Sequence, residues 1–296
     1  MKALILNDGR LGHLNQSLGL VKLKGYDYDI CEVRYRNRLF KILSYLCDRL
    51  HLYTDLLFDA ELPVGDYDLV IGAGSTTAYP VKVAAKTLGA KSVAMMLPKG
   101  YRFDYDVIFA QQHDRPPKRS NIVELPVNFS VTEPQGLFIA SKPSIGIIIG
   151  GDNAVFSLSV QQLKKQLDAI FKHFEGYTLA VTTSPRTSSD VETLLRSYPF
   201  DYSVYFASNP VNPIPDFLTQ CERVFITQDS TSMISEAVAN GDAAIEVLPL
   251  MSEGANKFTR LTDALEKGGF LHLFDGSFAN ANRKVDFMRY IESAGL

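Results

Sequence analysis

The chain has 296 residues, of which 46% are hydrophobic and 21% are charged, and its formal net charge at pH 7 is −3. This length predicts about two domains, each able to bury a core, and the composition excludes a disordered chain. Because no excess of basic residues is available to neutralise phosphates, the charge argues against a nucleic-acid-binding protein.

Short apolar runs alternate with helical patterns in the first part of the chain. The runs predict strands at residues 2–6, 66–71, 92–97, 106–110 and 121–125. The first strand leads through the loop Asn7–Ser17 into a helix, and the second leads through Gly72–Thr77 into a helix that reaches Lys86. This alternation is typical of βαβ units and a parallel sheet.

A polar stretch then interrupts the pattern. Residues 131–143 contain Pro134 and Pro143 and show no periodicity, so we expect a linker between an N-terminal domain of residues 1–130 and a C-terminal domain of residues 144–296. In the second domain, strands are expected at residues 144–149, 178–181, 204–206, 223–227 and 243–247. The last helix belongs to this domain or packs back on the first.

The expected fold class is therefore α/β, with two Rossmann-like, doubly wound parallel-sheet domains that face each other across a cleft. In open parallel sheets, ligands bind beyond the carboxyl ends of the strands. The small and polar loops of this chain follow the predicted strands in both halves. This convergence predicts a ligand site in the cleft between the two halves.

The segment Thr227–Glu236 has the pattern of an anion site. An apolar strand ends in Asp229-Ser230-Thr231-Ser232, and a helix begins there. Free N–H groups and the positive end of the helix dipole attract anions at such a position, and Glu236, about one turn further on, has oxygens that accept from sugar hydroxyls. The alternative is that Asp229 or Ser230 only caps the helix while Ser235 and Glu236 lie on its surface.

His13 is the histidine with the most informative surroundings. It lies in a glycine-flanked loop beside Asp8 and Asn15. An imidazole titrates near neutrality and suits a general base that deprotonates an acceptor hydroxyl. The alternative is a histidine that caps its own helix, and His113 is a second, weaker candidate.

Two further kinds of motif give only weak indications of a cofactor or a cation site. Gly72–Thr77 resembles half of a dinucleotide fingerprint, but the third glycine is missing and the loop does not follow the first strand. We therefore expect no bound cofactor. The pairs Asp27/Asp29, Asp66/Asp68 and Asp104/Asp106 are interpreted as solvated strand starts rather than as cation ligands.

Cysteine spacing and hydropathy indicate the compartment. Cys31, Cys47 and Cys221 lack the spacing of metal ligands, so we expect free thiols in a reducing cytosol and no metal site. The N-terminal apolar run is too short for a signal peptide or a membrane span. The expected location is cytoplasmic, and the basic, apolar segment Tyr35–Leu57 is a candidate for peripheral contact with the inner membrane. Its alternative is an ordinary surface helix with snorkelling basic side chains.

These short motifs resemble the mitochondrial-fission "elongated mitochondria" family, whose bacterial members are often labelled as nucleoside-diphosphate-sugar epimerases. The resemblance begins at Gly9–Leu20 and covers almost the whole chain in the right order. It continues at Gly74–Pro80, Gln112–Arg115, Ile149–Asp152, Thr182–Thr187, Asn209-Pro210, Asp229–Ala237 and Phe274–Gly276. The family usually has a tryptophan after Phe-Asp-Gly, where this chain has Ser277-Phe278-Ala279.

The family is similar in layout to GT-B glycosyltransferases, and this resemblance implies a metal-independent transfer of a sugar from a nucleotide-sugar donor to an unknown glycan or lipid acceptor. The expected catalytic residues are His13 and, as a second choice, Asp8. The expected donor-binding residues are Gly150, Gly151, Asp152, Thr183, Ser184, Arg186, Asp229, Ser230, Thr231, Ser232, Ser235 and Glu236. The expected acceptor-side residues are Arg10, Gly12, Asn15, Gln16, Gly74, Ser75 and His113.

Two other functions are open at this point. In plants the family is associated with recruitment of a dynamin-like protein, which suggests a non-catalytic scaffold that binds a protein partner or a membrane surface. The epimerase label is the third interpretation, and it fits poorly because the cofactor fingerprint is absent.

Overall fold

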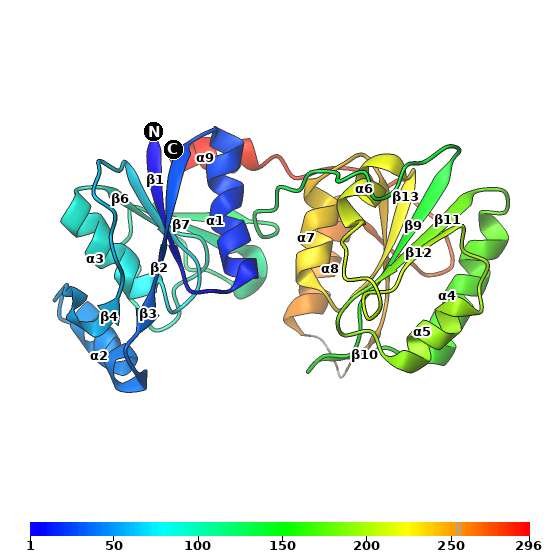
Figure 1. Ribbon diagram of the computed structural model, residues 1–296, viewed down its shortest axis with the longest axis horizontal. Helices are drawn as coiled ribbons and strands as arrows, with labels where there is room; N and C mark the ends of the chain where they lie inside the picture. Colours follow the sequence, from blue (N-terminus) through cyan, green and yellow to red (C-terminus); the bar gives the residue numbers. More distant parts are fainter. Residues whose placement is uncertain (253, 255) are drawn as a thin grey trace. The chain divides into compact units, whose positions relative to one another are not determined.

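The computed structural model describes residues 1–252, 254 and 256–296. The chain divides into two units, of which the first comprises Met1–Val131 and Asp286–Leu296 and the second comprises Thr132–Val285. Each unit contains its own sheet and helices (Figure 1). The expected α/β class with two Rossmann-like parallel-sheet domains is confirmed.

The first unit is built on a parallel sheet with the strand order β2-β1-β5-β6-β7-β8. Its strands are β1 (Lys2–Asn7), β2 (Asp27–Glu32), β5 (Leu69–Gly72), β6 (Lys91–Ala94), β7 (Val107–Gln111) and β8 (Ile122–Leu125). Its helices are α1 (Leu11–Lys24), α2 (Arg38–Arg49), α3 (Ala78–Leu88) and α9 (Phe287–Ser293), with the 3-10 turns η1 (Asp55–Leu57) and η2 (Gln112–Asp114) and the small antiparallel pair β3 (Arg34–Tyr35) and β4 (Phe58–Asp59). Helices cover both faces of the sheet, so its central strands are buried along almost their whole length and are mostly apolar.

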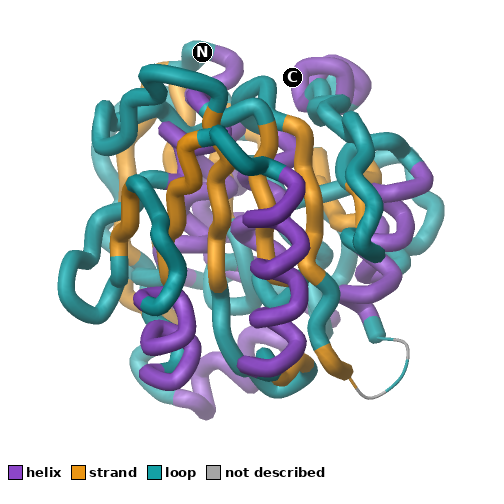
Figure 2. Tube along the Cα trace, turned by 90° about the vertical axis from the view of Figure 1, so that its right-hand side faces the viewer, coloured by secondary structure: helices purple, strands orange, loops and turns teal. Residues whose placement is uncertain are grey.

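The second unit repeats this plan with the order β12-β11-β9-β13-β14-β16. Its sheet strands are β9 (Ser144–Ile149), β11 (Thr178–Thr183), β12 (Tyr202–Val204), β13 (Arg223–Thr227), β14 (Ala244–Leu248) and β16 (His272–Leu273). Its helices are α4 (Val160–His173), α5 (Ser189–Arg196), α6 (Ile214–Gln220), α7 (Thr231–Ala239) and α8 (Lys257–Lys267), and β10 (Phe156–Ser157) pairs with β15 (Met251–Ser252). Figure 2, in which this unit faces the viewer, shows its strands side by side with helices packed on them.

The stretch suggested as a linker is tied to the second unit. The backbone N–H groups of Gln135, Gly136 and Leu137 donate to the carboxylate of Asp216 at 2.8–3.2 Å. The last helix, α9, belongs to the first unit. There its Phe287 stacks on Phe129.

One strand with mostly exposed positions was not predicted, and the boundaries of two others differ from those predicted. β2 has only one fully buried position, Cys31, because it lies at the edge of its sheet, so no apolar run marks it. The strand expected at 204–206 lies at Tyr202–Val204, and the strand expected at 92–97 ends at Ala94. The acidic pairs do mark strand starts, since Asp27 opens β2 while Asp68 and Asp106 directly precede β5 and β7.

None of the described helices is long and apolar enough to cross a bilayer.

Candidate functional site

Both sheets have a point where the strand order reverses. In the first unit, β2 lies on one side of β1 and all later strands lie on the other side, so the reversal falls between β1 and β5. In the second unit the reversal lies between β9 and β13. Loops diverge at the carboxyl ends of such strand pairs and leave a crevice in which ligands of doubly wound sheets bind. The loops after β1 and β5, and those after β9 and β13, carry most of the predicted site residues.

In the first unit, Asp8 and His13 form a pair at this position. The Nδ1 atom of His13 lies 3.0 Å from Oδ2 and 3.1 Å from Oδ1 of Asp8. The Asp8 side chain is only 2% exposed, while that of His13 is 19% exposed. A carboxylate that accepts from Nδ1–H orients the ring and leaves Nε2 of a neutral imidazole as the basic atom. The expected combination of Asp8 and His13 is therefore brought together in the geometry that a general base needs.

The His13 ring, in the first turn of α1, also lies against the loop after β5. A Cβ atom added to Gly74 would lie 2.3 Å from Cε1 of His13, and Gly74 has a φ of +83°. Only glycine combines this backbone conformation with such close approach. The loop after β1 and the loop after β5 thus meet at the reversal of the strand order.

Lys41 is a member of this cluster that the sequence did not indicate. Its Nζ donates to Ser75 Oγ at 3.0 Å and to Thr76 Oγ1 at 3.4 Å. Burial lowers the pKa of Lys41, the positive charge of Arg10 lowers it further, and the charge of Asp8 opposes both effects. Lys41 comes from α2, more than 30 residues away in sequence from its partners, so no local pattern could have linked them.

The remaining acceptor-side residues are less closely grouped. Asn15 is exposed on α1, whereas Gln16 on the same helix is turned inward and is 5% exposed. Gly12 has open space around its Cα. His113 lies in η2 after β7, which is separated from β5 by β6. His113 is therefore not at the reversal point of the sheet.

In the second unit, Asp229 joins three loops. Its side chain is fully buried. It accepts from the N–H of Gly151 at 3.2 Å, from Nη2 of Arg186 at 2.6 Å and from Thr227 Oγ1 at 2.7 Å. Gly150 N–H in turn donates to Thr227 Oγ1 at 2.7 Å. Asp229 therefore fixes the loops after β9, β11 and β13 relative to one another.

The glycines of this cluster allow close packing. A Cβ on Gly150 would lie 2.2 Å from the Asp229 carboxylate oxygens, and a Cβ on Gly151 would lie 1.9 Å from the carbonyl oxygen of Arg186. Their N–H groups are engaged by protein side chains. The Arg186 guanidinium is held by Asp229 and by the Gly151 carbonyl oxygen while its side chain stays 40% exposed.

Several of the predicted polar groups form bonds within the second unit. Asp152 accepts from Leu158 N–H at 2.7 Å, and Ser235 donates to the Thr231 carbonyl at 2.7 Å. Thr183 Oγ1 accepts from Phe206 N–H at 2.9 Å, and Ser184 Oγ contacts Thr187 Oγ1. These bonds fix the local conformation of the segments that contain the four residues.

α7 begins at the same edge. Ser230 is its N-cap and its Oγ accepts from Met233 N–H at 3.3 Å, whereas Ser235 is buried and does not lie on the helix surface as the capping alternative expected. The N–H groups of a first helical turn have no partner within the helix, and Thr231 and Ser232 occupy this turn. Glu236 lies further along α7, where its Oε1 is buried and makes no hydrogen bond to a described residue.

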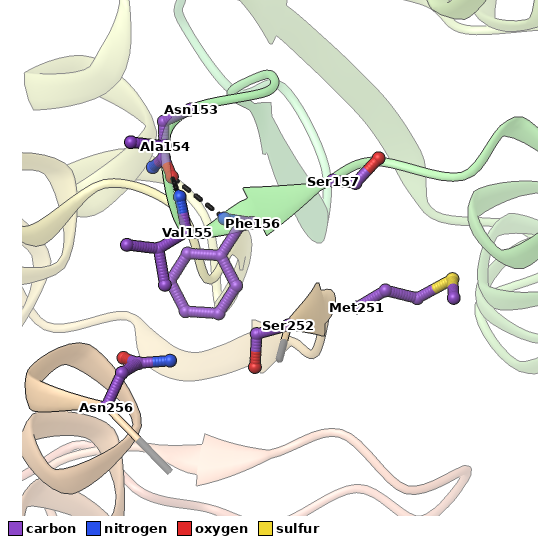
Figure 3. Close-up of a pocket in the computed structure, with 8 residues that line it drawn as sticks. All are labelled: Asn153, Ala154, Val155, Phe156, Ser157, Met251, Ser252 and Asn256. Atoms are coloured by element: carbon purple, nitrogen blue, oxygen red, sulfur yellow. Dashed lines mark hydrogen bonds between the residues drawn. The ribbon is translucent and has the colours of Figure 1, made fainter. Parts of the chain in front are cut away.

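A pocket of about 620 Å³ lies beside these loops (Figure 3). It is lined by Asn153, Ala154, Val155, Phe156, Ser157, Met251, Ser252 and Asn256. Asn153 connects it to the cluster, because its Nδ2 donates to the Asp229 carbonyl oxygen at 3.0 Å while its Oδ1 accepts from the N–H groups of Val155 and Phe156. No sequence pattern predicts this pocket, because nothing in the sequence indicates that β10 and β15 pair.

A family model described as mitochondrial fission ELM1 matches residues 11–291. The chain belongs to this family. No curated protein matches it. The match includes the loops after β5, β9, β11 and β13 and begins just before His13, so the second cluster lies within the matched residues, whereas Asp8 of the first cluster precedes them.

Solved structures resemble this ELM1-family chain in fold. The glycotransferase of kitacinnamycin has a TM-score of 0.50 at 12% identity, with 99% of this chain and 90% of that one covered. MurG from Acinetobacter baumannii has a TM-score of 0.47 at 16% identity, with 95% and 87% covered. The glycosyltransferase SnogD from Streptomyces nogalater has a TM-score of 0.48 at 14% identity, with 99% and 93% covered. At 12% identity, the similarity to the kitacinnamycin glycotransferase concerns the fold alone, and it agrees with the two parallel-sheet, Rossmann-like domains of this chain.

Glu236 gives the ELM1-family chain a pH-dependent stability. Burial raises its pKa to about 7 from an ordinary value of 4.5. The folded state therefore holds a proton that the unfolded state releases, and this contribution to stability is lost as pH rises from about 4.5 through 7. We expect Glu236→Gln to be more stable than the parent at pH 8, by on the order of 2–3 kcal/mol, and similar to it near pH 4.5.

Urea unfolding at several pH values between 4.5 and 8 measures this difference. Glu175→Gln is the control, because Glu175 is exposed at the end of α4 and its replacement should leave the pH profile unchanged. If the free energy of unfolding changed with pH in the same way in the parent and in Glu236→Gln, the Glu236 carboxyl would not be buried in its protonated form.

Proposed function

We propose that this protein is a GT-B-type glycosyltransferase that moves a sugar from a nucleotide-sugar donor to a hydroxyl of a glycan or lipid acceptor. The observation that carries the proposal is the placement of the two clusters at the strand-order reversals of both sheets. One cluster offers a base, and the other offers groups for an anion and for hydroxyls.

The second unit would hold the donor. The first-turn N–H groups of α7, with Ser230, Thr231 and Ser232, would bind the diphosphate at the positive end of the helix dipole. Arg186, anchored by Asp229, would add positive charge next to them. The Glu236 carboxyl, which burial keeps largely protonated below pH 7, can donate to and accept from a ribose or sugar hydroxyl.

The first unit would hold the acceptor. In the reaction, the bond between the sugar C1 and the diphosphate oxygen breaks and a bond between C1 and the acceptor oxygen forms. His13 Nε2 would take the proton from the acceptor hydroxyl, with Asp8 holding the imidazolium that results. The nucleoside diphosphate leaves with the bonding electrons, and the α7 N-terminus and Arg186 would stabilise its charge.

A thermal-shift screen tests the donor half first. UDP, GDP, CMP, dTDP and their sugars are compared with NAD. A ligand at about 100 times its dissociation constant adds roughly 2.7 kcal/mol to stability, which raises Tm by a few degrees. We expect one nucleotide family to produce this shift, and Ser232→Ala and Glu236→Gln to reduce it.

Thr193→Ala is the matched control, because Thr193 is an exposed hydroxyl on α5 whose side chain bonds only to its own helix. A shift with NAD alone would favour the epimerase. A well-folded protein that responds to no nucleotide would refute the donor site.

A non-catalytic scaffold is the second candidate. It is favoured by the internal bonds of Asp152, Thr183 and Ser235, which leave few of the predicted donor groups for a ligand. A scaffold predicts that His13→Ala retains full activity in cells, whereas a transferase predicts its loss.

A further inference from the structure

α2 packs on its unit with an inward side that is partly polar and partly aromatic. Among its residues, Ser44 and Asp48 are the buried ones. Asp48 accepts from Lys82 Nζ at 2.6 Å and from Arg102 N–H at 2.7 Å, and Ser44 Oγ bonds to Tyr101 Oη at 2.9 Å. A surface helix of a soluble protein ordinarily buries its apolar stripe and exposes its polar one. α2 packs Tyr45 and Cys47 against the core, but it also buries Ser44 and Asp48 and leaves a row of leucines outside.

The outer side of α2 is correspondingly apolar. Leu39, Ile42, Leu43, Leu46 and Leu50 recur at helical spacing and are 74%, 64%, 41%, 52% and 58% exposed. A groove of about 540 Å³ runs along them and is lined also by Asn37 and Phe40. Leu52 and Leu56, 56% and 67% exposed, extend the apolar side chains beyond the helix. We call these seven apolar side chains the α2 stripe. Contiguous exposed apolar surface of this kind marks an interaction site.

The charges around the α2 stripe are basic, although the whole chain is acidic. Residues 34–57 contain five Lys or Arg and two Asp, against a net charge of −3 for the chain. One of the two acids, Asp48, is buried under Lys82, and Asp55 in η1 is the other. Arg38 and Arg49 are exposed at the two ends of α2. Arg36 is paired with Asp59, whereas Lys41 is turned toward Ser75.

We propose that the α2 stripe docks on an anionic membrane surface. An amphipathic helix lying in the interface buries leucines among the acyl chains while arginines at its ends reach the lipid phosphates. Charge complementarity favours this occupant over a second copy of the chain, since two copies would bring Arg38 and Arg49 of each close to those of the other. Anionic headgroups attract such a basic, apolar face.

Sedimentation of the full-length protein with vesicles tests the proposal. Vesicles of phosphatidylcholine with 30% phosphatidylglycerol are compared with pure phosphatidylcholine at low and at 0.5 M salt. We expect binding to the anionic vesicles that weakens with salt. Leu39→Ser/Leu46→Ser should reduce binding at least tenfold, and Arg38→Gln/Arg49→Gln should reduce binding to the anionic vesicles selectively.

Ile139→Ser is the matched control, because Ile139 is 77% exposed in the second unit and its replacement should leave binding unchanged. All replaced side chains are exposed, and circular dichroism verifies that each variant is folded. No sedimentation of the parent with anionic vesicles would overturn the proposal. So would a parent dimer that Leu39→Ser/Leu46→Ser converts to a monomer without changing vesicle binding.

Discussion

Replacing Lys82 by methionine is expected to lower the free energy of unfolding by about 3–5 kcal/mol. The Lys82 side chain is 3% exposed and forms ion pairs with Asp48, which is fully buried, and with Asp104. Its removal leaves the Asp48 carboxylate in the interior without a positive partner. This cost exceeds what the methionine recovers by packing, because an unpaired buried charge is among the most destabilising changes known.

Thermal unfolding followed by circular dichroism measures the effect, which should lower Tm by on the order of 10 °C. Lys86→Met is the control, since Lys86 lies one turn further along α3 with its ammonium exposed over the Tyr53 ring. In Lys82→Met/Asp48→Leu no charge is left unpaired, so this double variant should recover part of the loss. A double variant less stable than Lys82→Met would contradict the account.

Replacing Asp229 by alanine should cost about 2–4 kcal/mol, because each buried donor left without an acceptor costs about 1–3 kcal/mol. The change removes the acceptor of the Gly151 N–H, of the Thr227 hydroxyl and of Arg186. The Arg186 side chain is 40% exposed, so water can solvate its charge, and the loss is smaller than for Lys82. Asp229→Asn keeps an acceptor oxygen and should fall between alanine and the parent.

Differential scanning calorimetry gives the stabilities, and the nucleotide screen applied to the same variants gives a second readout. Asp229→Ala should abolish any nucleotide-dependent shift, because the loops after β9, β11 and β13 lose their common partner. Asp168→Ala, which removes an exposed carboxylate on α4, should change neither measurement. A variant Asp229→Ala with parental stability would show that the loops are held by other contacts.

Much of the fold could be predicted because the central strands are continuous apolar runs. β9 and β13 were located to the residue from such runs, and loops that follow them could be placed at the carboxyl edge of a parallel sheet. β2 could not be predicted this way, since an edge strand with exposed faces has no such run. The pairing of His13 with Asp8 could be predicted because the two residues are only five positions apart in sequence, with Asp8 just before α1 and His13 in its first turn.

The remaining features depend on contacts between distant parts of the chain. Lys41 reaches Ser75, Arg186 reaches Asp229, and Lys82 reaches Asp48 across 34 residues or more in each case. The orientation of α2 follows from the last of these pairs. The pattern of apolar and polar residues in α2 does not by itself show which side faces the core. The buried partners of Ser44 and Asp48, together with the stacking of Tyr45 on Tyr101, turn the leucines outward.

Two sides of α2 therefore carry groups that are available for contacts. Lys41 extends from one side to the hydroxyls of Ser75 and Thr76, beside the Asp8–His13 pair, and the leucines of the α2 stripe cover another. α2 is a single 12-residue helix, so a ligand that shifted the helix as a unit would move Lys41 and the leucines together. Whatever binds at the leucines and whatever binds at Lys41 would then change each other's affinity by the same factor, as thermodynamic reciprocity requires. A single helix would thus couple a surface contact to the chemistry of the first unit.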